Sequence, residues 1–553
     1  MGNGKMPEQD RYIQRDDFDD AAYQRRREER MKKLKKRKRD VLMMRLAVLA
    51  VSIIIIAAAG FIIHAAISGK GPHPEKLLQH FTKNDKSSGE DTATPGADNA
   101  EADKSGQDAS SADQAQQSQP EVKETAAAQE ENASSDASSG SMEDVIAKAQ
   151  LLADGYDYDA AIEAVTSLPD YESSEQAAQA VASWQQQKAS CVAVDVYSVP
   201  HIFYHSLLND TDRAFNTSVL GQFAVDGMNA WMTTIEEFDK ITQQLYDNGY
   251  VYVRLRDLVK ETQNADGSVS FEANTQLMLP PGKKAIVLSI DDLSYYHSYK
   301  AAGFPDKLVL DDNGLVKCQY TDASGQTTIG DYDVIPRLNT FLREHPDGSY
   351  HGARGLVAMT GYNGVFGYRT DQDYELRENL MEDQARWLEE NPDFNRQEEI
   401  EKATVIADAI KAEGWEFASH TWGHLSVTGV SVDKLRVDNE RWISNVQNIV
   451  GPVDTIIFAH GNDIGNWEGY SSDNEKYAYY HGAGYNFFCN VDGSVPYWVQ
   501  ITSDYVRQGR IDLDGYMLYR ASTGQTTVVD SLFTASEVFD QRRPTPVVAN
   551  GQG

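Results

Sequence analysis

From residue 191 onward, short apolar strands alternate with amphipathic helices, and this alternation most constrains the fold. Residues 233–259 read as a capped helix followed by a strand, and residues 398–421 and 432–461 repeat that unit. A strand over residues 283–292 ends in two acids. Such repeats predict an α/β fold with a parallel sheet. In these folds the chemistry lies at the carboxyl ends of the strands, so the polar residues that follow strands are the ones to examine.

The N-terminal part has the pattern of a membrane anchor. Residues 46–63 are 18 uncharged, mostly apolar residues, enough for about 27 Å of helix. We expect a transmembrane helix over residues 46–66 after a basic cytoplasmic tail, residues 1–45. The basic run at residues 32–40 predicts a single-pass protein of the cell membrane, with its C-terminal part outside. A cleaved signal peptide is the alternative, but its apolar core is normally shorter.

Two further segments separate the anchor from the strand–helix repeats. Residues 67–141 are rich in Ser, Ala, Asp, Glu and Gln, a composition that predicts a disordered linker. Residues 142–190 place apolar residues at helical spacing and predict a small helical module with a weak resemblance to a tetratricopeptide pair. This module is either a spacer packed on the next domain or a docking surface for a protein partner. The remaining residues, 191–545, form the predicted α/β domain.

Charge and cysteine content exclude several classes of protein. Of the net charge of −33, residues 1–45 contribute +6 (15 Lys and Arg against 9 Asp and Glu), which leaves −39 for the rest. This strong negative charge on the residues after residue 45 argues against nucleic-acid binding. The three cysteines are scattered, without a CxxC pair, which argues against a disulfide scaffold and favours buried thiols. No GxSxG elbow and no phosphate-binding glycine-rich loop occur, which weakens serine-esterase and kinase alternatives.

Two strand ends carry residues with the chemistry of a metal site. Asp291 and Asp292 close one strand, and two adjacent buried carboxylates require a cation or a shared proton. His420 closes another strand, and a helical turn after it would bring His424 onto the same face. A metal held by Asp292, His420 and His424 would supply the cation and activate a water molecule, with Asp291 accepting the proton of that water. These residues predict a hydrolase for an amide or ester.

A second histidine pair has the same spacing but a different setting. His201 and His205 lie in a predicted strand, where four residues span about 13 Å. These two side chains therefore cannot hold one ion. His201 is interpreted as a core or surface residue, whereas His205 lies near the expected end of the strand, and its role stays open.

The order strand-Asp-Asp followed by His-Thr-x-x-His resembles the polysaccharide deacetylase (NodB-homology) family, carbohydrate esterase family four, over residues 196–530. The resemblance implies a distorted (β/α) barrel, a divalent metal that is commonly zinc, and removal of N-acetyl groups from polymers of N-acetylglucosamine. It also implies that Asp291 is the base and that Asp292, His420 and His424 are the metal ligands. Three further segments add to the resemblance: residues 200–205, 249–258 and 414–420.

The chain also departs from that family. His460 and Gly461 stand where the third motif has an arginine and a proline, so the group that orients the base is open. No histidine follows His481, so the late histidine that acts as general acid in the family has no counterpart. His460 is a candidate for that acid. His297, a few residues past the two acids, is another candidate and a possible contact for substrate.

Asp292 and His420 are separated by 128 positions in the chain, a separation that is long for this family. The intervening segment includes a predicted hairpin with a turn at residues 312–314 and an aromatic segment, residues 361–371. Tyr362 and Tyr368 in that segment are expected either to stack on sugar rings of a bound glycan or to pack against the barrel.

Three functions remain open from the sequence. The first is a metal-dependent hydrolase that removes N-acetyl groups from cell-wall or surface polysaccharide such as peptidoglycan. The second is a catalytically degraded relative that binds glycan or metal without turnover. The third is a membrane-tethered adaptor that acts through the helical module.

Overall fold

The computed structural model describes residues 141–465 and 468–549. Within these ranges no helix has the length and apolar character needed to cross a membrane. The predicted tail and membrane span, residues 1–66, and almost all of the predicted linker, residues 67–141, lie outside the described residues.

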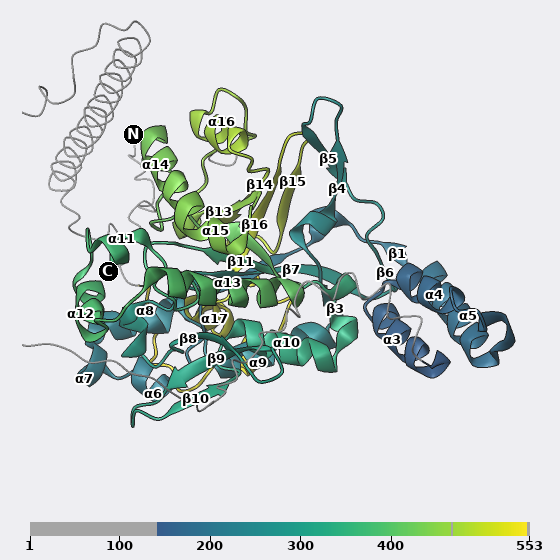
Figure 1. Cartoon of the computed structure of the whole chain (residues 1–553), viewed down its shortest axis with the longest axis horizontal. Helices are drawn as coiled ribbons and strands as arrows, with labels where there is room; N and C mark the ends of the chain where they lie inside the picture. The colour runs from purple at the N-terminus through teal and green to yellow at the C-terminus, as the bar shows by residue number, and fades with distance from the viewer. Residues whose placement is uncertain (1–140, 466–467, 550–553) are drawn as a thin grey trace, which may run out of the picture. The chain divides into compact units, whose positions relative to one another are not determined.

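A closed barrel of seven parallel strands forms the body of the chain (Figure 1). Each strand pairs in parallel with the next around the ring, and β11 closes it by pairing with β7. This ring confirms the parallel sheet expected from the alternating pattern and is consistent with the (β/α) barrel that the family resemblance implies. In ring order the strands are β11 (Leu356–Met359), β12 (Glu416–Ser419), β13 (Thr455–Ile457), β14 (Phe487–Val491), β16 (Val506–Asp512), β2 (His201–Tyr204) and β7 (Lys284–Asp291).

Amphipathic helices cover the outside of the barrel. In α9, a capping box between Thr234 and Glu237 satisfies the first backbone N–H groups, and the apolar face of the helix is buried. Two short strands extend the sheet: β3 pairs with β7, and β15 pairs with β16 in the antiparallel sense. Their bounds and those of the principal helices are α9 (Ile235–Asp247), β3 (Tyr250–Tyr252), α10 (Val334–Glu344), α13 (Arg396–Ala412), α14 (Val432–Trp442), α16 (Glu475–Gly482), β15 (Trp498–Ile501) and α17 (Gly515–Ser522).

The long stretch between β7 and β11 contains the predicted hairpin. Strands β8 (Lys307–Leu310) and β9 (Val316–Thr321) pair antiparallel around a turn in which Gly314 has φ of +77°. Only glycine adopts that conformation without a steric cost. A third strand, β10 (Thr327–Gly330), extends this sheet and was not predicted.

The helical module consists of α3 (Met142–Asp154), α4 (Tyr158–Thr166) and α5 (Glu175–Ser190). It packs on the barrel through two hydrogen bonds. The hydroxyl of Tyr156 donates to the backbone carbonyl of Asp347, and the backbone N–H of His351 donates to the backbone carbonyl of Gly155. Both barrel residues precede β11. The module therefore contacts the amino ends of the strands, opposite to the end where the acids and histidines lie.

Candidate metal centre and active site

Asp291 and Asp292 lie at the carboxyl end of β7. Successive side chains of a regular strand point to opposite faces, but Asp292 has φ of +59°, which ends the strand there. Asp and Asn tolerate this left-handed conformation better than most residues. As a result both carboxylates reach the same histidine pair: an oxygen of Asp291 lies 3.7 Å from Nε2 of His420, and an oxygen of Asp292 lies 3.3 Å from Nε2 of His424.

The two histidines follow β12 in a tight turn rather than in the expected helical turn. Thr421 and His424 both have positive φ angles. The carboxylate of Asp438 on α14 accepts hydrogen bonds from the backbone N–H groups of Trp422 and Gly423, at 2.7 and 2.9 Å, and so stabilises the turn. The two histidines nonetheless lie close together as predicted, with the centroids of their imidazole rings 5.1 Å apart.

Three of the predicted residues have the arrangement of a metal site. One ligand atom each of Asp292, His420 and His424 lies within 4.8 Å of the others. Two imidazoles and one carboxylate, with positions left for water, form the donor set of a catalytic zinc site. The prediction that these three residues lie together is confirmed. Their imidazole nitrogens and carboxylate oxygen are donors that fit a divalent cation.

Hydrogen bonding prepares His420 to act as a ligand. Its Nδ1 lies 2.8 Å from the backbone carbonyl of Ile457. A carbonyl only accepts, so Nδ1 carries the proton and the lone pair of Nε2 faces the other ligands. Burial lowers the pKa of His424 to about 4, although Asp292 opposes this shift. His424 is therefore neutral near pH 7, as metal binding requires.

Arg510 on β16 orients the carboxylate of Asp291. Its guanidinium donates two hydrogen bonds to the two carboxylate oxygens, at 2.8 and 2.9 Å, and a third to the hydroxyl of Ser289 at 3.1 Å. Burial alone would raise the pKa of Asp291, but Arg510 and His420 outweigh it and hold that pKa below its ordinary value. Asp291 is thus an ionised carboxylate with a fixed orientation, as a general base must be.

Arg510 was not predicted from the sequence. The sequence has no arginine near His460, which follows β13, and the arginine that holds Asp291 comes from β16, two strands further around the ring. Arg510 lies within a strand whose central residues are all buried, an observation that only the structure provides. An arginine in such a position requires a buried anion.

Tyr296 binds the carboxylate of Asp292, one of the three candidate metal ligands. Its hydroxyl donates to Asp292 at 2.7 Å and lies 2.8 Å from the hydroxyl of Thr360. The ring of Tyr362 stacks on that of Tyr296, with centroids 5.2 Å apart, and meets Trp422 edge to face. Tyr362 is half-buried, so the structure places this predicted substrate contact beside the metal cluster.

The other two predicted substrate contacts bind other side chains or backbone groups of the protein. Tyr368 is buried in the hydrophobic core between the barrel and the helices that cover it, and its hydroxyl donates to the carbonyl of Leu308. Nε2 of His297 lies 2.8 Å from the hydroxyl of Tyr374, and its ring packs 5.7 Å from that of Trp387. Burial lowers the pKa of His297 to about 3, so its ring is uncharged.

His460 lies next to His424 of the cluster and is exposed to solvent. It follows β13 with φ of +59°. Its ring is 4.3 Å from that of His424, and its Nε2 lies 3.2 Å from the backbone carbonyl of His424. The structure therefore brings His460 to the site, and its role as general acid stays a prediction.

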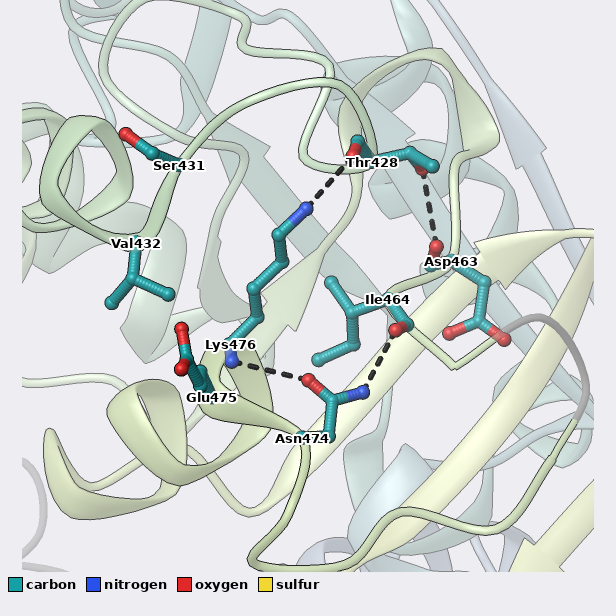
Figure 2. Close-up of a pocket in the computed structure, with 8 residues that line it drawn as sticks. All are labelled: Thr428, Ser431, Val432, Asp463, Ile464, Asn474, Glu475 and Lys476. Atoms are coloured by element: carbon teal, nitrogen blue, oxygen red, sulfur yellow. Dashed lines mark hydrogen bonds between the residues drawn. The ribbon is translucent and has the colours of Figure 1, made fainter.

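A pocket of about 420 Å³ lies between the loops that continue from His424 and His460 and the start of α16 (Figure 2). The two loops are joined by a hydrogen bond from the hydroxyl of Thr428 to the carbonyl of Asp463. In Figure 2 the side chain of Lys476 extends from α16 toward Thr428, whose backbone carbonyl it binds at 2.8 Å. The pocket has a polar lining and is built by the segments that carry the two histidines.

Comparison with known proteins adds little. No family model matches the chain, and no curated protein matches it. Among solved structures, the Streptococcus pyogenes deacetylase PplD, determined in complex with acetate, is similar at 11% identity over 57% of this chain and 92% of that chain. With a TM-score of 0.26, that likeness establishes neither a shared fold nor a shared activity.

Proposed function

We propose that this protein is a metal-dependent hydrolase that removes acetyl groups from a glycan. One observation carries the proposal. Asp291, ionised and held by Arg510, lies beside the three-residue cluster of Asp292, His420 and His424. A fixed base next to a metal site with open positions is an arrangement that can hydrolyse an amide or ester.

We assign metal binding and proton transfer to different residues of the site. Asp292, His420 and His424 would hold the divalent cation, which we propose to be zinc and which polarises the acetyl carbonyl when bound. Asp291 accepts the proton of the attacking water. Arg510 keeps Asp291 ionised and aligned, and Tyr296 orients the carboxylate of Asp292.

The proposed substrate is N-acetylglucosamine within cell-wall or surface polysaccharide, such as peptidoglycan. The resemblance of the two motifs supports this choice. The half-buried ring of Tyr362 beside the cluster supplies a surface for sugar stacking. We further propose that the catalytic domain acts outside the cell membrane, anchored by residues 46–66, with a protein partner for the helical module as a separate possibility.

The test is acetate release by the full chain, purified in mild detergent, from acetylated peptidoglycan and from oligomers of N-acetylglucosamine. Release should require a divalent metal and should stop with a chelator. Asp291→Asn should abolish it while leaving metal binding intact, whereas His420→Ala should abolish both. Binding of metal and glycan without acetate release would instead identify a protein that binds glycan and has lost turnover.

A further inference from the structure

Asp512 is the last residue of β16 and lies one inward position beyond Arg510. Side chains two residues apart on a strand share a face, and Arg510 points into the barrel, where its guanidinium carbon lies 4.0 Å from the centroid of the Phe203 ring. Asp512 pairs with Phe203 in the register of β16 and β2. Its side chain therefore lies on the same interior face, one step nearer the carboxyl ends where the metal cluster lies.

The surroundings of Asp512 are acidic. Asp291 on β7 and Asp514, which precedes α17, both repel a negative charge on Asp512, and Arg510 is the cation that attracts one. Arg510 already donates two hydrogen bonds to Asp291. The Oδ1 atom of Asp512 is buried and has no hydrogen-bond partner among the described residues.

Asp514 gives Asp512 no compensating charge. Its carboxylate accepts the backbone N–H of Met517 at 2.7 Å as the N-cap of α17. Arg543 attracts Asp514 and Glu237 repels it. That arginine is itself paired with Glu237. Asp514 is buried and Asp512 is partly buried with a buried Oδ1 atom. Two such neighbouring carboxyls without a cation of their own retain a proton between them.

Asp512 and Asp514 are expected to hold a proton, whereas the base, Asp291, is expected to be ionised. Burial and the neighbouring Asp514 raise the pKa of Asp512 well above its ordinary value, and burial raises the pKa of Asp514 to about 7. The pKa of Asp291 is held low. Paired carboxyl groups that their environments drive in opposite directions are characteristic of an acid and a base in one active site.

We propose that Asp512 is the proton donor to the leaving nitrogen, an inference that rests on the hydrolase function proposed above. The oxygen of water bonds to the acetyl carbon while its proton passes to Asp291. The C–N bond then breaks as the carboxylic proton of Asp512 passes to the nitrogen, which releases the amine and acetic acid. Asp291 ends protonated and Asp512 ionised, and proton exchange with solvent restores both groups.

The test compares two substrates that differ in leaving group. An acetylated amine needs a proton on its nitrogen, whereas 4-nitrophenyl acetate releases a stable phenolate without one. For Asp512→Asn we expect amide turnover to fall by about 10²–10⁴-fold and ester turnover to change by less than about threefold. Asparagine has the shape and neutral charge of the protonated acid, so the variant should fold and bind metal like the wild type. Melting temperature and metal content check both points.

Two histidine variants form the matched comparison. His460→Gln and His205→Gln should not show the selective loss of amide turnover. His205 is included because its Nδ1, like Oδ1 of Asp512, is buried without a hydrogen-bond partner among the described residues. Asp291→Asn should lose both substrates. The proposal is overturned if Asp512→Asn retains amide turnover, if it loses both substrates equally, or if a histidine variant alone shows the selective loss. A wild-type protein inactive on both substrates would refute the hydrolase function itself.

Discussion

Arg510 and Asp291 lie 219 residues apart in the chain and form a buried pair of parallel hydrogen bonds in the barrel interior, at 2.8 and 2.9 Å. The pair joins β16 to β7 across the intervening strand β2. Both side chains are almost fully excluded from solvent. A bidentate arginine fixes the plane of a carboxylate as well as its charge.

Removing the arginine should therefore cost both stability and activity. Arg510→Met leaves Asp291 buried without a counter-charge, and we expect a loss of about 3–5 kcal/mol in the free energy of unfolding, measured by denaturant titration. Adding Asp291→Asn to this variant should recover part of that loss, because the uncompensated charge is gone. Full additivity of the two substitutions would contradict a direct interaction.

Arg510→Lys tests orientation separately from charge. Lysine keeps the positive charge but cannot make two parallel hydrogen bonds. We expect lower turnover, and we expect the acidic limb of the pH–rate profile to move to higher pH because the pKa of Asp291 rises. The pairing itself contributes stability above the unfolded pKa of about 4 that is lost as pH falls toward the lower folded pKa. An unchanged acidic limb would argue that another group controls it.

Metal binding should stabilise the folded chain. At a metal concentration 100 times the Kd, the gain is about 2.7 kcal/mol, seen as a rise in melting temperature that a chelator reverses. His424→Ala should lose most of this rise. His481→Ala, at an exposed histidine on α16, is the matched control and should keep it. An equal response in both variants would place the metal elsewhere.

Tyr296 should set metal affinity through Asp292. Tyr296→Phe removes the hydroxyl that donates to Asp292, and loss of such an outer hydrogen bond typically weakens metal binding by about 10–100-fold. Competition with a chromogenic chelator measures the change. Tyr250→Phe, whose hydroxyl bonds the carbonyl of Ser531 near the opposite end of the barrel, should leave the affinity unchanged.

His297 should contribute to loss of stability in acid. Its pKa is lowered from 6.5 to about 3 in the folded chain, so between these values the unfolded chain binds more protons than the folded one. Stability is therefore fully present above pH 6.5 and falls as pH decreases through this range. His297→Gln should give a shallower decline of unfolding free energy with decreasing pH. A slope equal to that of the wild type would show that other groups control the decline.

Local patterns were enough to predict an α/β fold and the meeting of Asp292, His420 and His424 at one place. Alternating helices and strands predicted an α/β fold with a parallel sheet, because each unit buries its apolar face against the sheet. That the sheet closes into a barrel was implied by the family resemblance. The Asp-Asp pair and the two histidines each end a strand, so their meeting at one edge follows from parallel pairing. The turn that carries His424 was predicted as helical, because its actual shape depends on Asp438 of α14.

The sequence by itself thus determined which residue types stand at the carboxyl ends of the strands, because those positions are set by local periodicity. Only the tertiary structure decided that Arg510 reaches Asp291, that Asp512 lies beside them, and that Tyr368 is buried in the core. These relationships depend on which strands become neighbours when the ring closes and on which face of each strand turns inward. Contacts between residues so far apart in the chain leave no periodic trace, so they arise only when the barrel is assembled.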